Sequence, residues 1–183
     1  MGRDKAQVKL AGSSLLQRVL TVVCPLFDDV MLSRRNNDAE IRGARLIEDQ
    51  LPGRGPAIGV CAALGQAKHP YVFVIACDMP FISAGLIERL VSQCSDYDIV
   101  VPVRAGKPEP LCAVYSTACL KMLAERIMQG KRGLVSFIEH TPELRIRRVD
   151  EHELDTADPD LRSFVDIDSE NALAAAEIML ADA

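Results

Sequence analysis

A carboxylate directly follows the most apolar stretch of the chain. Residues 71–76 (Tyr-Val-Phe-Val-Ile-Ala) are continuously apolar, and residues 77–80 (Cys-Asp-Met-Pro) come next. Such a run is typical of a strand covered on both faces, and we expect it to be the most buried strand. Ligands of open α/β sheets bind beyond the carboxyl ends of the strands. Asp78 is therefore a candidate ligand for Mg²⁺, which proteins commonly hold with one or two carboxylates plus substrate phosphates. The alternative is that Asp78 only ends the strand, although Ser83 is a suitable cap for the helix that follows.

Two glycine-containing segments could bind phosphate. Residues 55–59 (Gly-Pro-Ala-Ile-Gly) lie directly before a predicted helix. Gly55 permits close approach of the backbone, and the amino end of a helix attracts anions. At the start of the chain, Gly2 and Lys5 lie in Met-Gly-Arg-Asp-Lys, which could hold a phosphate or a base. The plainer interpretations are an ordinary Gly-Pro turn and a solvated terminus.

Six charged residues in the second half of the chain are further candidates: Lys107, Glu109, Lys131, Arg132, Asp166 and Asp168. The first two precede a predicted strand, and the next two lie between glycines that separate two helices. The two aspartates point the same way on an extended segment. Each pair also has a structural interpretation: a loop, solvated cations near a helix-ending glycine, and a solvated edge that caps the last helix.

The elements that must position these residues alternate between strand and helix patterns. We expect strands at residues 29–33, 45–48, 71–76, 99–101 and 112–115, and helices at residues 15–23, 58–67, 83–93, 119–128, 133–139 and 169–180. This alternation predicts an α/β fold with a mainly parallel sheet flanked by helices on both faces. Because the chain shows no repeat or linker, we expect a single domain over residues 1–183.

Composition restricts the function classes. The net charge is −5, which disfavours a nucleic-acid-binding protein, and no apolar run approaches the roughly 20 residues of a membrane-spanning helix. The amino-terminal stretch is polar and resembles no signal peptide, so a cytoplasmic location is the default expectation. Six cysteines occur without a Cys-x-x-Cys pair, and three histidines are scattered. We therefore expect buried reduced thiols, and neither a zinc site nor a histidine-based triad.

Taken in order, these segments resemble the molybdenum cofactor guanylyltransferases, the MobA-type family of nucleotidyltransferases. The resemblance covers nearly the whole chain and implies a Rossmann-like nucleotidyltransferase fold. It rests on residues 1–5 (MGRDK), 10–12 (LAG), 15–19 (LLQRV), 47–49 (IED), 55–59 (GPAIG), 77–81 (CDMPF), 108–110 (PEP), 113–115 (AVY) and 130–133 (GKRG).

The resemblance also implies roles for the candidates. Lys5 and Asp49 would contact the guanine nucleotide, with Gly2 and Gly55 beside it, and Asp78 would bind Mg²⁺. Asp78 and Lys5 would be the catalytic residues, and the six later charged residues would lie on the molybdopterin side. The implied reaction is attack of the molybdopterin phosphate on the α-phosphorus of GTP, with release of pyrophosphate. Transient contact with molybdoenzymes or other cofactor-synthesis proteins stays open, and no nucleic-acid or membrane partner is expected.

The chain departs from the family pattern in three places. Family members begin with a strand and a Leu-Ala-Gly-Gly phosphate loop, whereas this sequence starts where that loop would end. We therefore expect the first strand to be missing and the natural protein to be about 15–20 residues longer. The Asn-x-Asn of the family is Asp166-Ile167-Asp168 here. The family's asparagine after the second strand has no clear counterpart, since Arg35 holds the aligned position beside Asn36.

Two other functions stay open at this level. A molybdopterin cytidylyltransferase would share the fold and the metal-binding aspartate. A degenerate nucleotide- or cofactor-binding protein without catalytic activity would fit the missing phosphate loop.

Overall fold

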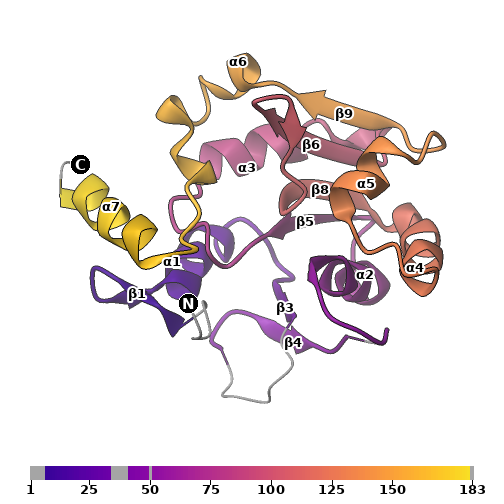
Figure 1. Ribbon diagram of the computed structural model, residues 1–183, viewed down its shortest axis with the longest axis horizontal. Helices are drawn as coiled ribbons and strands as arrows, with labels where there is room; N and C mark the ends of the chain where they lie inside the picture. The colour runs from indigo at the N-terminus through magenta and orange to yellow at the C-terminus, as the bar shows by residue number, and fades with distance from the viewer. Residues whose placement is uncertain (1–6, 34–40, 50, 182–183) are drawn as a thin grey trace.

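A mixed five-stranded sheet forms the centre of the protein (Figure 1). The computed structural model describes residues 7–33, 41–49 and 51–181. The sheet has the order β5-β8-β6-β7, and a fifth strand, β9, pairs with β6. Its strands are β5 (Tyr71–Ile75), β6 (Ile99–Arg104), β7 (Lys107–Pro108), β8 (Cys112–Ser116) and β9 (Ile146–Val149).

The prediction of a mainly parallel sheet is wrong. Strand β8 runs antiparallel to both β5 and β6, and β7 is antiparallel to β6, while β9 is parallel to β6. Ala105 and Gly106 both have positive φ, 46° and 76°, which suits the tight turn that reverses the chain between β6 and β7. Only residues 109–111 then separate β7 from β8. Strands β7 and β8 therefore run in the same direction beside β6, and the single tight turn makes both of them antiparallel to it, since a parallel connection would need a crossover of about a dozen residues.

Helices cover both faces of the sheet, as expected. Along β6, Ile99 and Val101 pack into one hydrophobic cluster while Val100 packs into another. The first cluster includes residues of α2 (Pro56–Gln66), α4 (Leu120–Met128) and α5 (Leu134–Glu139). The second includes residues of α1 (Leu15–Val23), α3 (Ala84–Val91) and α6 (Glu151–Leu154). The alternation of side chains along each strand thus produces three layers.

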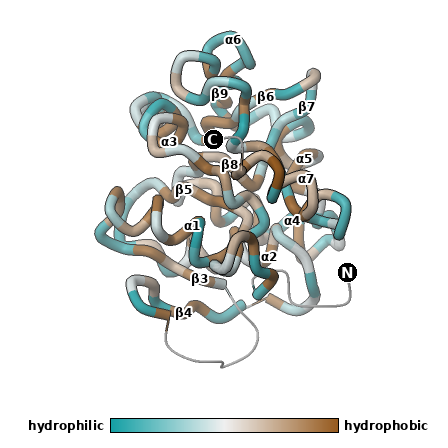
Figure 2. Tube along the Cα trace, turned by 90° about the vertical axis from the view of Figure 1, so that its left-hand side faces the viewer, coloured by the Kyte–Doolittle hydropathy of each residue, from teal (hydrophilic) through white to brown (hydrophobic). Residues whose placement is uncertain are grey.

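The predicted helices begin and end close to the expected residues. The Ser83 hydroxyl accepts a hydrogen bond from the Leu86 amide and caps α3, which confirms the predicted cap. Ser14 and Gln17 form a capping box at the start of α1. A last helix, α7 (Glu170–Ala181), follows the 3-10 helix Pro159–Phe164. Figure 2 shows hydrophobic stretches of the helices interrupted by hydrophilic ones, as expected for helices that bury one side.

A second, two-stranded sheet lies beside β5. Strands β3 (Met31–Ser33) and β4 (Arg45–Ile47) pair in parallel, and a cavity of about 560 Å³ lies between them and β5. Both faces of β5 are covered, because Val72 and Val74 pack on one cluster and the other three residues on the second. Every residue of β5 is nevertheless only half-buried, whereas Ile99–Pro102 and Cys112–Tyr115 are fully buried. The prediction that β5 is the most buried strand is therefore wrong, since one of its edges borders the cavity.

A short hairpin precedes α1. Strands β1 (Lys9–Leu10) and β2 (Ser13–Ser14) pair across Ala11 and Gly12, both with positive φ.

All six cysteines are free, and three of them are buried, which agrees with the expected reduced thiols. No helix in the described ranges combines the length and apolarity that crossing a membrane requires.

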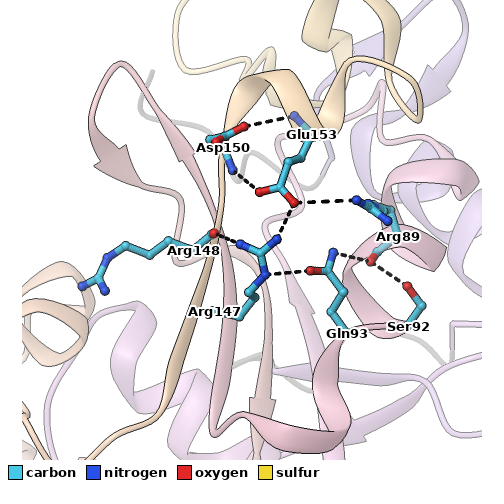
Figure 3. A network of polar contacts seen from close by, with 7 residues as sticks. All are labelled: Arg89, Ser92, Gln93, Arg147, Arg148, Asp150 and Glu153. Atoms are coloured by element: carbon cyan, nitrogen blue, oxygen red, sulfur yellow. Dashed lines mark hydrogen bonds and ion pairs between the residues drawn. The ribbon is translucent and has the colours of Figure 1, made fainter.

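A polar network links strand β9 to α6 and to α3 (Figure 3). Arg147 of β9 is ion-paired with Glu153 of α6, and its Nε donates a hydrogen bond to Gln93 Oε1 at 2.9 Å. Glu153 also lies 3.7 Å from an amino group of Arg89 and completes a capping box with Asp150. This network includes none of the candidate site residues, so we assign it a structural role.

Candidate active site

Three of the predicted site residues border the same cavity. Asp49 follows β4, Gly55 precedes α2 and Asp78 follows β5, and all three line the space between the two sheets. Ser33, at the end of β3, lines it as well. The ends of three strands and the start of one helix thus border one cavity, and ligands of α/β sheets bind beyond the carboxyl ends of the strands.

Asp49 is oriented by a residue that the sequence did not indicate. The Ser33 hydroxyl donates a hydrogen bond to Asp49 Oδ1 at 3.0 Å. Ser33 in turn packs closely on Gly59 of α2, where an added Cβ would lie 3.0 Å from the Ser33 oxygen. Only the position of Ser33 at the end of a predicted strand could have signalled its role.

Gly55 begins α2 in a conformation that favours glycine. Its φ is 126°, and Pro56 takes the first helical position, where a missing N–H costs nothing. No side-chain cap occupies the amino end of α2 within the described residues. Pro56 has no N–H and the Ile58 amide donates to the Gly55 carbonyl oxygen at 3.1 Å, so the attraction of this helix end for a phosphate rests mainly on the helix dipole.

The segment that carries Asp78 is fixed by a distant part of the chain. The Ile167 amide donates to the Asp78 carbonyl oxygen at 2.9 Å, and the Ser83 amide donates to Ser163 Oγ at 2.9 Å. Ile167 is fully buried, while Asp166 and Asp168 on either side of it are exposed. The backbone pairing therefore brings both aspartates close to the Asp78 loop.

Glu109 lies in electrostatic reach of Asp166. Burial raises the pKa of the Glu109 carboxyl, Arg104 opposes this shift, and Asp166 adds to it. The loop around Glu109 is held by its own amide, which donates to the Pro102 carbonyl at 2.9 Å, and by the Tyr115 hydroxyl, which donates to the Pro110 carbonyl at 2.8 Å. Arg104 was not identified from the sequence, because its partner Phe164 lies 60 residues away; Tyr115 belongs to the family-like segment 113–115, but its bond to Pro110 was not expected.

The remaining candidates are spread over the surface. Lys107 is exposed on β7, and Lys131 is exposed after α4. Arg132 lies beside the loop that precedes α2: a Cβ on Gly53 would stand 2.5 Å from its Cζ, and its Nη2 is 3.5 Å from the Pro52 carbonyl oxygen. The structure thus places Arg132 next to the Gly55 loop and not beside Glu109. Gly2 and Lys5 lie outside the described residues.

The donors present fit a metal that is held largely by its substrate. In the described part of the chain, no three acidic, histidine or cysteine side chains form a ready-made metal cluster. A single carboxylate at a strand end, Asp78, is instead compatible with Mg²⁺, which retains several waters and binds substrate phosphates.

Comparisons with known proteins agree with this geometry. A model of the MobA-like NTP transferase domain matches residues 1–147. The molybdenum cofactor guanylyltransferase of Desulfosudis oleivorans is 35% identical over 179 residues, covering 96% of this chain and 87% of that protein.

Solved structures show the same fold. The molybdopterin-guanine dinucleotide biosynthesis protein A of Archaeoglobus fulgidus has a TM-score of 0.86 and 27% identity, covering 100% of this chain and 93% of that chain. A Mycobacterium tuberculosis protein solved as a complex with manganese has a TM-score of 0.65 and 16% identity, covering 97% of this chain and 91% of that chain. At this low identity, the second likeness concerns the fold alone.

Proposed function

The chain belongs to the MobA-like NTP transferase family, and from this premise we propose that it transfers GMP from GTP to molybdopterin. The oxygen of the molybdopterin phosphate attacks the α-phosphorus of GTP. A new P–O bond forms, the bond between the α- and β-phosphates breaks, and pyrophosphate leaves. The product is the guanine dinucleotide form of the molybdenum cofactor.

The observation that supports this proposal best is that Asp49, Gly55 and Asp78 line the same cavity. These residues come from three separate elements, and each has a distinct use in nucleotidyl transfer. The Asp49 carboxylate accepts hydrogen bonds from the guanine ring N–H and amino group. The amino end of α2, which begins after Gly55, receives phosphate oxygens.

Asp78 would hold Mg²⁺ beside the phosphates. When bound, the metal neutralises charge on the phosphates and on the departing pyrophosphate. The protein's own contribution is positioning: Ile167 and Ser163 fix the Asp78 loop, and Ser33 fixes Asp49. Such positioning supplies a large part of the rate enhancement of group transfer.

The second substrate would bind on the side of Glu109, Asp166 and Asp168. The two aspartates are exposed, and Glu109 is half-buried within electrostatic reach of Asp166. The exposed Lys107 and Lys131 would supply positive charge on this side, whereas Arg132 lies beside the loop that precedes Gly55.

The test is a transfer assay with GTP labelled at the α-phosphate, molybdopterin and Mg²⁺. We expect label to appear in a dinucleotide product, and CTP to be used poorly, because cytosine lacks the ring N–H and amine geometry that Asp49 would recognise. A lost buried partner costs about 1–3 kcal/mol, or roughly ten- to a hundredfold in affinity.

Asp49→Asn should reduce the preference for GTP over CTP. Glu48→Gln is the matched control, since this neighbouring carboxylate is exposed and only its backbone carbonyl accepts a hydrogen bond. Preferred use of CTP would instead identify a cytidylyltransferase. Nucleotide binding without any transfer would identify a non-catalytic binding protein, and either result would overturn the proposal.

A further inference from the structure

Arg104 connects the central sheet to the segment that carries Asp166 and Asp168. It is the last residue of β6 and is half-buried. Its Cζ lies 5.0 Å from the centroid of the Phe164 ring, and its Nη1 donates to the Phe164 carbonyl oxygen at 3.3 Å. One guanidinium thus contacts both the ring and the backbone carbonyl of Phe164. A lysine ammonium could not make both contacts in this way, because it lacks the planar fork of donors.

Phe164 is the first residue of a short stretch that ends beside the loop carrying Asp78. Phe164 is buried in the cluster that also contains Met79 and Ile82, the residues that follow Asp78. Three residues later, the buried Ile167 donates its amide proton to the Asp78 carbonyl. The stretch between these two anchors is therefore fixed at both ends, by Arg104 at one end and by the Asp78 backbone at the other.

We propose that Arg104 is a positioning residue: by holding Phe164 it sets where Asp166 and Asp168 stand relative to Asp78 and to the second substrate. The inference rests on the proposed function, because it assigns these aspartates to the substrate side. In the described part of the chain, Arg104 itself contacts neither the residues that would bind the nucleotide nor the Asp78 carboxylate.

The surroundings of Arg104 indicate that this residue does not serve chiefly to stabilise the fold. Its Nε is buried and has no hydrogen-bond partner in the part of the chain that the structure describes. A buried donor without an acceptor opposes folding, so a hydrophobic residue would serve stability at least as well. Its positive charge also acts on the carboxylates of Glu109 and Asp158, where it opposes the effect of burial. Arg104 therefore favours the ionised forms of these two carboxyls.

The test compares Arg104→Met and Arg104→Lys with Arg148→Met. The control removes the same charge from β9, where the Arg148 side chain is exposed and points away from the polar network (Figure 3). Hydrogen exchange of the free protein is measured for residues 165–168, together with kcat and KM for both substrates. Both Arg104 variants should exchange faster in this stretch, and the lysine variant, which keeps the charge but not the fork, should not recover the protection.

We expect the Arg104 variants to change the KM values of the two substrates to different extents. KM for molybdopterin should rise about tenfold in Arg104→Met, whereas KM for GTP should change less than about twofold, since Asp49 and Gly55 belong to other elements. Arg148→Met should match the unaltered protein in both measurements. Unchanged exchange of residues 165–168, or an equal rise of both KM values, would overturn the inference. If the protein transfers no nucleotide at all, the proposed function fails, and the exchange measurement still tests the positioning role.

Discussion

Replacement of Asp29 by asparagine should destabilise the protein in a pH-dependent manner. Asp29 precedes β3, and its side chain is only 5% exposed. Its Oδ1 lies 2.7 Å from Arg45 Nε and 3.3 Å from Lys68 Nζ. Arg45 also donates to the Gln66 carbonyl at the end of α2, at 2.6 Å. The carboxylate therefore anchors the arginine that ties the two-stranded sheet to the helix beginning at the nucleotide rim.

The magnitude follows from the pKa of Asp29, which the hydrogen bond from Arg45 lowers from 3.8 to about 2, against the opposing effect of burial. One pKa unit corresponds to 1.36 kcal/mol, so the ionised group contributes about 2.5 kcal/mol to the free energy of unfolding. Because the pKa is lower in the folded state, this contribution is complete above about pH 4 and is lost as the pH falls towards about 2. In a chain of this size, it corresponds to about 5–10 °C in the thermal midpoint.

The assay is urea unfolding of the unaltered protein and of Asp29→Asn between pH 7 and pH 3. We expect a difference of about 2.5 kcal/mol near neutral pH that narrows below pH 4. Asp28→Asn is the matched control: its side chain is 80% exposed and pairs with His69, so its effect should stay below about 1 kcal/mol. A difference that stays constant from pH 7 to pH 3, or an equal effect of Asp28→Asn, would refute the reasoning.

Three further predictions concern the site. Asp78→Asn should lower Mg²⁺-dependent transfer by more than about a hundredfold, measured by product formation across a Mg²⁺ titration, and near-normal turnover would contradict the metal assignment. Gly59→Ala should raise KM for GTP, because the added Cβ would lie 3.0 Å from the Ser33 hydroxyl oxygen on β3. In Gly65→Ala, in the same helix, the added Cβ meets its nearest side-chain atoms only at 3.9 Å, so KM should stay unchanged. Equal KM values for the two alanine variants would refute that explanation. Asp166→Asn combined with Asp168→Asn should weaken the dependence on Mg²⁺ and tighten binding of the anionic pterin substrate by less than about tenfold, as measured by titration at low salt; no change in either quantity would return the pair to a purely structural role.

The helices and strands were largely predictable, because each has a local pattern that the sequence displays. The apolar period of residues 15–23 and the serine before it correspond to α1 and its capping box. Strand β9 and helix α6 were not expected. The two adjacent arginines of β9 resemble a solvated segment, and its pairing with β6 makes it part of the sheet, supported by the ion pair from Arg147 to Glu153. The direction of β8 was also mispredicted, since the decisive feature is the tight turn at Ala105 and Gly106.

The candidate site was predictable only in part. The position of Asp78 follows from the apolar strand before it, and that of Gly55 from the helix after it. No local pattern indicated Ser33 as the partner of Asp49 or Arg104 as the partner of Phe164, because these pairs are separated by 16 and 60 residues. It also grouped Arg132 with Glu109, whereas the structure sets it beside Gly53. Gly2 and Lys5 remain predictions, as do the substrates.

The sequence by itself determined the family, the alternation of strands and helices, and the residue types that could bind a nucleotide and a metal. These features depend on short-range properties: side-chain period, capping and the apolar character of a strand. The tertiary structure decided which candidates share a site, because contacts such as Ile167 with Asp78 require chain segments far apart to pair across the sheet edge. No local pattern encodes such a contact, since it arises only when buried strands fix the relative positions of the loops that follow them.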